Sequence, residues 1–273
     1  MIYLILAISC SVLIANLIRM SQEKNARLFP TIAINYGIAL IISYYLWDGE
    51  IKCHDIDIFL GFLNGILFFS GFICYFGALK SAGIATSVSI MRLAIAIPII
   101  FGFFYFKDLL SLNRVIGIGM TFSALFLLSK FALKTHELRA FIWLGGLFAT
   151  CGFADVINKF MNVYGHNKGV YLISIYGFSL LFSSIYLIIK REFPNLKEFI
   201  FGIFLGIPNQ LTTLFTLMAL KNIDSIVVFP TIGLGVLLGS VASDIIIWKE
   251  SIDIEKWIAF IMASIAIILL NTA

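Results

Sequence analysis

The chain has 273 residues, of which 61% are hydrophobic and only 12% are charged. A soluble domain carries about 25% charged residues, and one water-soluble core of this size cannot bury so much apolar surface. The composition therefore excludes an ordinary soluble protein and indicates one that lies in lipid. The net charge of +4 is modest, and the Lys and Arg residues lie mostly between apolar runs, which indicates membrane topology rather than a nucleic-acid partner.

A helix needs about 20 apolar residues to cross the hydrocarbon core of a bilayer, which is about 30 Å thick. The sequence contains ten such runs, at residues 1–20, 28–47, 56–79, 84–106, 112–130, 138–162, 169–189, 197–220, 225–247 and 254–272. We therefore expect an all-α integral membrane protein with ten transmembrane helices. The first run has no basic n-region and no clear cleavage site, so it does not resemble a signal peptide. Short loops lead us to expect that successive helices are neighbours.

One pattern of small and charged residues occurs twice. The matching positions are 141 residues apart and, after one inserted residue, 142 apart: Gly61 and Gly65 with Gly202 and Gly206, Ala78-Leu79-Lys80 with Ala219-Leu220-Lys221, and Lys107-Asp108 with Lys249-Glu250. Matches at Gly, Lys and acidic positions arise less easily by chance than matches between apolar residues. The first two runs of each half match less well, with Lys159 as the rough counterpart of Arg19. We interpret the pattern as an internal repeat.

The repeat divides the chain into two halves of five runs. We expect a first five-helix repeat at residues 1–130 and a second at residues 138–273, with the boundary at residues 131–137. Five is odd, so the second half must enter the membrane from the opposite side, which is the inverted-topology repeat of many secondary transporters. With the N-terminus outside, the cytoplasmic loops carry about twice as many Lys and Arg residues as the outer loops. This bias favours both termini outside.

An aromatic residue, a lysine and an acid follow one another at the end of the fourth run and of the ninth. These segments are Phe106-Lys107-Asp108 and Trp248-Lys249-Glu250. Together with the two Ala-Leu-Lys segments, they resemble the drug/metabolite transporter superfamily, and more narrowly its EamA-type branch, over nearly the whole chain. The resemblance implies a gradient-driven carrier or exporter of small metabolites with a central cavity between the halves. It also implies cytoplasmic termini, so the orientation stays open.

Four ionisable side chains lie within apolar runs, where such groups are functional candidates. Arg92 lies within about 5 Å of the middle of its run, and its guanidinium fork suits a carboxylate or phosphate. The alternatives are a structural ion pair and snorkelling of the side chain to the membrane interface. Asp155 and Lys159 are four residues apart and can pair on one helix face, for either a structural or a functional reason. Asp244 could accept a proton or pair with a base, and we expect it to hold Arg92 in one conformation.

Polar side chains also follow Pro208 in the eighth run. Asn209, Gln210 and Thr213 would lie one or two turns beyond Gly206 and could orient a substrate. The alternative is packing by interhelical hydrogen bonds, each worth about 1 kcal/mol or less. Further candidates for the cavity are Asn64 and Tyr75. Proline within the runs, at Pro98, Pro208 and Pro230, either kinks a helix for packing or frees a carbonyl at a cavity.

The sequence contains no HExxH, GxSxG or Walker motif, and its three histidines lie in loops. Its four cysteines form no CxxC pair, so we expect neither a metal nor a cofactor. We expect a multi-pass protein of the cytoplasmic (inner) membrane that transports a small polar or amphipathic metabolite by alternating access. The coupling proton or ion, and the choice between monomer and dimer, stay open. The alternatives are a receptor-like or structural membrane protein and a membrane-embedded lipid enzyme.

Overall fold

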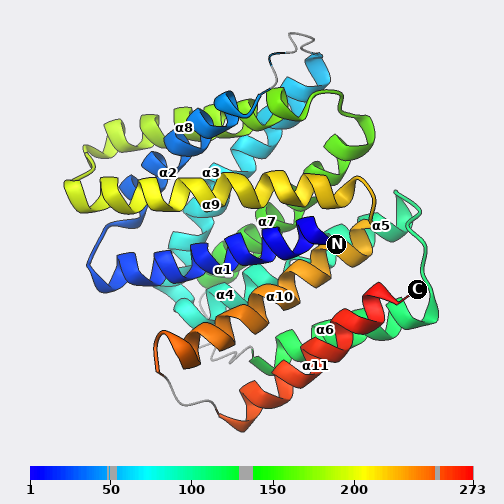
Figure 1. Cartoon of the computed structure of the whole chain (residues 1–273). Helices are drawn as coiled ribbons and strands as arrows, with labels where there is room; N and C mark the ends of the chain where they lie inside the picture. The colour runs from blue at the N-terminus through cyan, green and yellow to red at the C-terminus, as the bar shows by residue number, and fades with distance from the viewer. Residues whose placement is uncertain (48, 50–53, 129–137, 250–252, 273) are drawn as a thin grey trace.

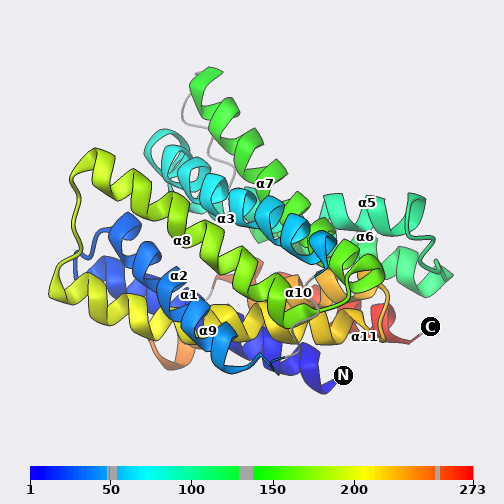
Figure 2. The same ribbon diagram turned by 90° about the horizontal axis from the view of Figure 1, so that it is seen from above.

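The computed structural model describes the whole chain except residues 48, 50–53, 129–137, 250–252 and 273, and the described residues form eleven helices (Figure 1). They are α1 (Ile2–Glu23), α2 (Leu28–Tyr45), α3 (Asp55–Ala82), α4 (Ile84–Leu93), α5 (Ala96–Phe104), α6 (Leu112–Leu128), α7 (Leu138–Tyr164), α8 (Lys168–Lys190), α9 (Leu196–Leu220), α10 (Ser225–Ile246) and α11 (Ile254–Asn271). The helices run side by side, and both chain ends lie toward the same end of the bundle (Figures 1 and 2). The all-α prediction is confirmed.

Nine of the described segments are long and apolar enough to cross a membrane. They match nine of the ten predicted runs closely, with α4 and α5 together forming one of them. The tenth prediction corresponds to α6, whose apolar part, Leu112–Leu127, is shorter. The predicted boundary between the halves, at residues 131–137, lies outside the described residues.

The fourth predicted run is broken in its middle, between α4 and α5. Pro98 has no N–H, and its ring would clash with the carbonyl of Ala94, four residues earlier, in a continuous helix. That carbonyl lies against α7, where a Cβ added to Gly152 would come within 2.8 Å of it. Pro208 and Pro230 lie inside the continuous helices α9 and α10. Of the three prolines, Pro98 therefore marks the break.

The main contacts join one half of the chain to the other. Helix α3 packs against α7 and α8, and α9 packs against α1 and α2. Helix α2 also contacts α8, and α6 contacts α11. The expectation that successive helices are neighbours is therefore wrong for most of the bundle. Each helix buries its small-residue face best against a helix of the other half, and short loops do not prevent this.

Glycine allows two of these contacts to be close, and the two contacts correspond. A Cβ added to Gly61 of α3 would lie 3.0 Å from the carbonyl oxygen of Tyr171 in α8. A Cβ added to Gly202 of α9 would lie 2.8 Å from the carbonyl oxygen of Thr31 in α2. The second glycine of each pair repeats the contact one turn later. The glycines are 141 residues apart (202 − 61), and their partners are 140 apart (171 − 31).

The first turns of α3 and α9 also correspond. Asp57 of α3 is fully buried, and its carboxylate accepts hydrogen bonds from the backbone N–H groups of His166 and Asn167 at 2.8 and 3.0 Å. Glu198 of α9 is equally buried and accepts from the backbone N–H of Arg27 at 3.2 Å. A side-chain hydrogen bond to Glu198 raises the pKa of Arg27, which keeps its guanidinium charged. Each acid therefore ties the start of one helix to the start of a neighbour from the other half.

Candidate functional site

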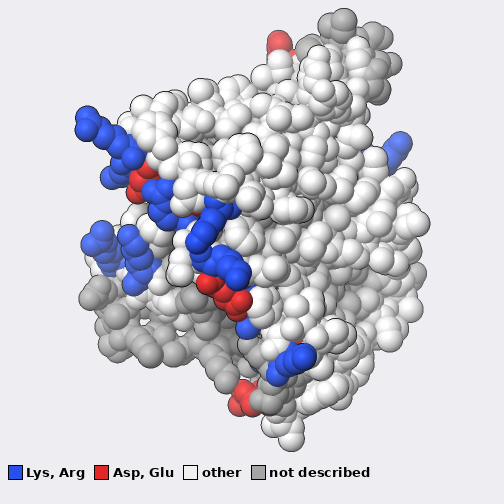
Figure 3. Space-filling model, turned by 60° about the vertical axis from the view of Figure 1, so that its left-hand side comes forward, with Lys and Arg blue, Asp and Glu red and all other residues white. Residues whose placement is uncertain are grey.

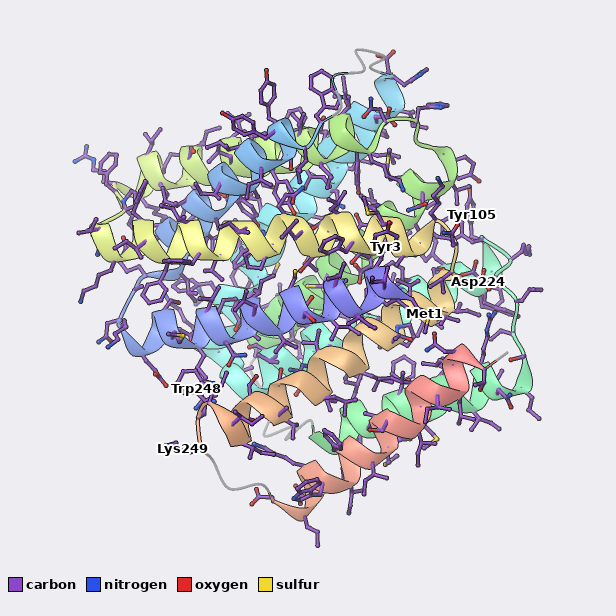
Figure 4. All side chains as sticks on the ribbon, viewed as in Figure 1. Met1, Tyr3, Tyr105, Asp224, Trp248 and Lys249 are labelled. Carbon is purple, nitrogen blue, oxygen red and sulfur yellow. The ribbon has the colours of Figure 1, made fainter. Side chains whose placement is uncertain are left out.

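A cavity of about 590 Å³ lies between α1, α4, α6, α10 and the start of α11. Its size is within the range of about 300–1,000 Å³ that is typical of small-molecule sites. The polar and aromatic residues that line it are Asn16, Arg19, Ser89, Arg92, Ser240, Ser243, Asp244, Trp248 and Lys256. It reaches the end of α10, where Trp248 and Lys249 lie (Figure 4). The cavity brings together the two residues that we expected to be partners, Arg92 and Asp244.

Asp244 is bound by two cations from neighbouring helices. Its carboxylate accepts hydrogen bonds from Nη1 of Arg19 on α1 at 3.2 Å and from Nζ of Lys256 on α11 at 3.3 Å. The side chains of Arg19 and Asp244 are 37% and 22% exposed, so the pair stabilises the fold by at most about 1 kcal/mol. In this conformation Asp244 does not bond to Arg92, so the expectation that it does so in one of two conformations stays a prediction. Depth along two helices predicts how high the residues lie, not which way they point around the helix axis.

Arg92 lies in the last turn of α4, immediately before the break, and is partly buried. Within the described part of the chain it makes no hydrogen bond and no ion pair, although the charge of Asp244 acts on it through space. The hydroxyl of Ser240, on the facing helix α10, is also buried and has no partner there. The cavity thus contains a cation, Arg92, and a buried hydroxyl, that of Ser240, that make no hydrogen bond with the described residues.

The aromatic residue of each aromatic–Lys–acid segment contacts a cation. The Arg19 guanidinium lies 4.0 Å from the centre of the Trp248 ring, and Lys159 Nζ lies 5.6 Å from the centre of the Phe106 ring. Contacts of this kind are worth about 0.5–2 kcal/mol. The two aromatic residues are 142 residues apart (248 − 106), and the two cations are 140 apart (159 − 19). This explains in physical terms why an aromatic residue begins both segments.

The lysine in the middle of each segment has a left-handed backbone. The φ angle is 58° at Lys107 and 52° at Lys249. In both segments the backbone N–H of the aromatic residue bonds to a carbonyl five residues earlier, Phe101 O for Phe106 and Ser243 O for Trp248. The two helices therefore end in the same turn. Glu250, which completes the second segment, lies outside the described residues.

At the opposite end of the bundle, Asp108 is the acid that binds Lys159. Its carboxylate accepts hydrogen bonds from Lys159 Nζ at 3.3 Å, from the backbone N–H of Ile226 at 3.2 Å, and from the hydroxyl of Ser225. These last two donors begin α10, where the helix dipole also favours a negative charge. The predicted partner of Lys159 was Asp155, and that pairing is absent. Asp155 instead lies one helical turn before Asn158, whose amide acts on its carboxylate.

The two ends of the bundle therefore differ. The side chains of Lys159 and Asp108 are only 10% and 4% exposed, and aromatic rings of Tyr105, Phe106 and Phe160 pack together beside them. Tyr105 and Asp224 mark this end in Figure 4, opposite Trp248. At the other end Arg19, the counterpart of Lys159, lines the cavity together with Asp244, whereas Glu250, the counterpart of Asp108, lies outside the described residues. The structure is thus closed by a buried ion pair at one end and hollowed at the other.

Lys and Arg residues gather at the hollowed end. Figure 3 brings forward the end at which α1 and α8 finish, and many basic side chains cover this face. The residues that flank the helix ends there include Lys24, Arg27, Lys190, Arg191 and Lys197. This is the end that we predicted to face the cytoplasm from the charge bias. The predicted boundary residues Lys130 and Lys134 lie outside the described part.

The polar patch on α9 lies elsewhere in the bundle. Asn209 donates to Asn35 Oδ1 at 3.2 Å, and the hydroxyl of Thr213 lies 2.8 Å from that of Tyr176. Gln210 is fully buried, and neither side-chain polar atom has a partner among the described residues. None of the three predicted residues on α9 is among those that line the cavity.

The remaining candidates are also separate from the cavity. Asn64 is buried and donates to the hydroxyl of Tyr171 at 2.7 Å and to Asn158 Oδ1 at 3.2 Å. Tyr75 packs against a small apolar cluster around Leu147. These contacts fit the packing interpretation. The charged and aromatic lining residues that we did not predict are Arg19, Trp248 and Lys256. The match between Arg19 and Lys159 was a signal for the first.

The structure brings two of the loop histidines together. The ring centroids of His54 and His166 are 4.1 Å apart. Among the described residues, no group of three or more His, Cys, Asp or Glu side chains could hold a metal ion. Cys53, one of the four cysteines, lies outside this part of the chain.

No family model matches the chain. It is 29% identical over 279 residues to an uncharacterized protein of Haemophilus influenzae, with 97% of this chain and 95% of that protein covered. It is also similar to a protein of known crystal structure, with a TM-score of 0.81 and 14% sequence identity. That match covers 99% of this chain and 98% of the other. At this identity the likeness shows a shared fold over the whole chain.

Proposed function

We propose that the chain is a secondary transporter that moves a small polar or amphipathic metabolite across the cytoplasmic membrane by alternating access between two inverted five-helix repeats. One observation carries the proposal. The corresponding cations Lys159 and Arg19 each pair with an acid, at opposite ends of the bundle, and one pair is buried while the other lines a cavity of about 590 Å³. A transporter needs such a difference, because only one side of its site is open at a time.

The surface supports insertion into a bilayer. Large apolar side chains are exposed along the helices, for example Ile5, Ile100, Phe204 and Ile268. Soluble monomers rarely expose contiguous apolar patches larger than a few hundred Å². The nine long apolar segments and these exposed side chains therefore favour a multi-pass membrane protein over a soluble one.

The contacts support the inverted repeat. The counterparts of α1, α2 and α3 in the second half are α7, α8 and α9. Exchanging counterparts converts the contact of α3 with α8 into that of α9 with α2, and the contact of α3 with α7 into that of α9 with α1. The glycine, acid and aromatic contacts described above follow the same exchange at separations of 140 to 142 residues. A two-fold axis produces such an exchange, and five helices in each half require the axis to lie in the membrane plane.

In this mechanism the two cation–acid pairs are gates. The Lys159–Asp108 gate is closed in the structure, and the Arg19–Asp244 gate stands at the open end. In the opposite state the end that contains Arg19 would be closed and the Lys159–Asp108 gate would be open. The break between α4 and α5 lies between the gates and allows the two half-helices to tilt independently, as in other transporters with discontinuous helices.

The orientation is part of the proposal. The cavity opens at the end rich in Lys and Arg, so the positive-inside bias places its mouth in the cytoplasm. Membership of the EamA-type branch of the drug/metabolite transporters fits the aromatic–Lys–acid segments, and the usual cytoplasmic termini of that branch would reverse this orientation. A labelling experiment that decides between them is given in the Discussion.

Exchange of metabolites in proteoliposomes tests the function. Liposomes with the purified protein are loaded with an unlabelled extract of small metabolites and placed in an isotope-labelled extract, and mass spectrometry identifies labelled compounds that enter. We expect at least one compound to accumulate only when the protein is present. The gate is tested in a variant whose native cysteines are replaced and which carries Asp108→Cys and Lys159→Cys. Joining these two cysteines with a short thiol cross-linker should stop the exchange, and cleaving the linker should restore it. Equal entry into protein-free liposomes for every compound would refute transport.

A further inference from the structure

We infer that the cavity binds a small organic anion and that Arg92 is the residue that recognises its carboxylate or phosphate group. The inference rests on the proposed function only for the role of the cavity in transport. The binding site itself follows from the charges and contacts of the residues that line it.

Arg92 is a cation that lacks a partner. It lies about two turns into α4, beside the break, and the described residues give it neither a hydrogen bond nor an ion pair. A charged group at membrane depth is costly unless it is paired or hydrated, and such residues usually face a cavity and mark a substrate path. Its guanidinium presents a planar fork of donors that matches a carboxylate or phosphate. An anion in the cavity would supply the missing partner.

The charges around the cavity also favour an anion. The described lining contains three cations, Arg19, Arg92 and Lys256, and one carboxylate, Asp244, which leaves an excess of two positive charges (3 − 1). Asp244 already accepts hydrogen bonds from both other cations. To reach Arg92, Asp244 would have to break its contact with Arg19 on α1 or with Lys256 on α11. An anion that enters the cavity can pair with Arg92 without breaking either contact.

The rest of the lining suggests an organic anion rather than a bare inorganic one. Apolar side chains, Val88, Leu125 and Leu237, line the cavity together with the hydroxyls of Ser89 and Ser240. The buried Ser240 hydroxyl has no partner among the described residues and can donate to a second ligand oxygen. A cavity of about 590 Å³ has room for a metabolite with an acidic group and a short apolar body.

Equilibrium binding to the full-length protein in detergent tests the inference. The probes are benzoate, succinate and glycerol 3-phosphate, each compared with its uncharged counterpart, benzamide, succinamide or glycerol. Affinity is measured from ligand-dependent thermal stabilisation and from the intrinsic tryptophan fluorescence, to which Trp248 in the cavity contributes. The carboxylate and phosphate probes separate the two kinds of acidic group. We expect at least one anion to bind and its uncharged counterpart not to bind.

The variants are Arg92→Gln, which removes the charge, and Arg92→Lys, which keeps the charge and removes the fork. The control is Lys197→Gln, which removes an exposed cation at the same end of the bundle but outside the cavity. We expect Arg92→Gln to weaken anion binding about tenfold to hundredfold, Arg92→Lys to weaken it less, and the control to leave it unchanged. If Arg92→Gln does not fold, Arg92→Lys still decides the role of the fork.

Three results would overturn the inference: no probe anion binds, an uncharged counterpart binds equally well, or both Arg92 variants bind like the wild type. The proposed function fails separately. Anion binding without exchange in proteoliposomes would leave the site in place and refute transport. Exchange of a neutral metabolite that is unaffected by Arg92→Lys would refute the anion site and leave transport in place.

Discussion

The rings of Tyr36 and Tyr176 lie 6.4 Å apart between their centroids, and each tyrosine makes the same hydrogen bond in its own half. The hydroxyl of Tyr36 donates to the carbonyl of Phe68 at 3.3 Å, and that of Tyr176 donates to the carbonyl of Asn209 at 3.2 Å. The tyrosines are 140 residues apart and the carbonyls 141 apart. A two-fold axis that passes between α2 and α8 would relate the two bonds.

Removing either tyrosine hydroxyl should therefore have nearly the same effect. We expect Tyr36→Phe and Tyr176→Phe each to lower the free energy of unfolding by about 0.5–1.5 kcal/mol, because each leaves a partly buried carbonyl with one partner fewer. Thermal unfolding of the purified protein in detergent measures the change. Tyr44→Phe is the control, because Tyr44 is 61% exposed and should change the midpoint little. A large effect for one buried tyrosine and none for the other would contradict their equivalence.

The paired glycine contacts give a second comparison. Gly61→Ala and Gly202→Ala should both destabilise the protein, by about 1–3 kcal/mol, because the new methyl groups would press on the backbones of α8 and α2. Gly119→Ala is a matched control on helix α6, since a Cβ at Gly119 meets nothing within 4 Å. Alanine also favours helix over glycine, so this control should unfold at the same or a higher temperature. Equal tolerance of alanine at all three positions would show that the close approach is unimportant.

Much of the helical architecture could be predicted because its signals are local. The length of the apolar runs predicted the helices to within a few residues, and the spacing of Gly61 and Gly202 predicted matching positions. The break between α4 and α5 could not be assigned to Pro98 rather than Pro208, because the sequence does not show which neighbour packs against each proline-containing segment. At the break that neighbour is α7 of the other half, where Gly152 allows the backbone of Ala94 to approach closely.

The site was predicted only in part. Arg92 and Asp244 both line the cavity, as ionisable groups within apolar runs would suggest. Their pairing was predicted from depth along two helices, and depth carries no information about direction around each axis. Asp244 is instead reached by Arg19, from a helix more than 200 residues earlier in the chain. The polar residues around Asn209 do make hydrogen bonds, but they do not line the cavity. Asn209 faces α2 and α8, where it contacts Asn35 and Tyr176.

Labelling from outside the cell decides the orientation. Lys190 and Lys221 are exposed at opposite ends of the bundle, at the ends of α8 and α9. In a variant without native cysteines, we expect Lys221→Cys to react with a membrane-impermeant maleimide in intact cells and Lys190→Cys to react only after permeabilisation. The reverse pattern would place the basic end outside and restore the orientation that the EamA resemblance implies. Reaction of both in intact cells would contradict a spanning protein.

The two cation–acid pairs should respond differently to the loss of one partner, because only one pair is buried. Lys159→Ala would leave Asp108 without its cation in a site that is 4% exposed, which costs about 3–5 kcal/mol for buried pairs. Arg19→Ala would leave Asp244 paired with Lys256 and partly hydrated, so we expect a smaller loss of about 1–2 kcal/mol, part of it from the lost contact with the Trp248 ring. If the buried pair is a gate, part of the stability lost in Lys159→Ala reflects opening of that end of the bundle and not global unfolding. A cysteine introduced by Ser225→Cys, beside Asp108, reports this opening through its rate of reaction with a small thiol reagent. Lys159→Ala should increase that rate, and Arg19→Ala should not. Equal stability and equal labelling of the two variants would show that neither pair controls access to the cavity.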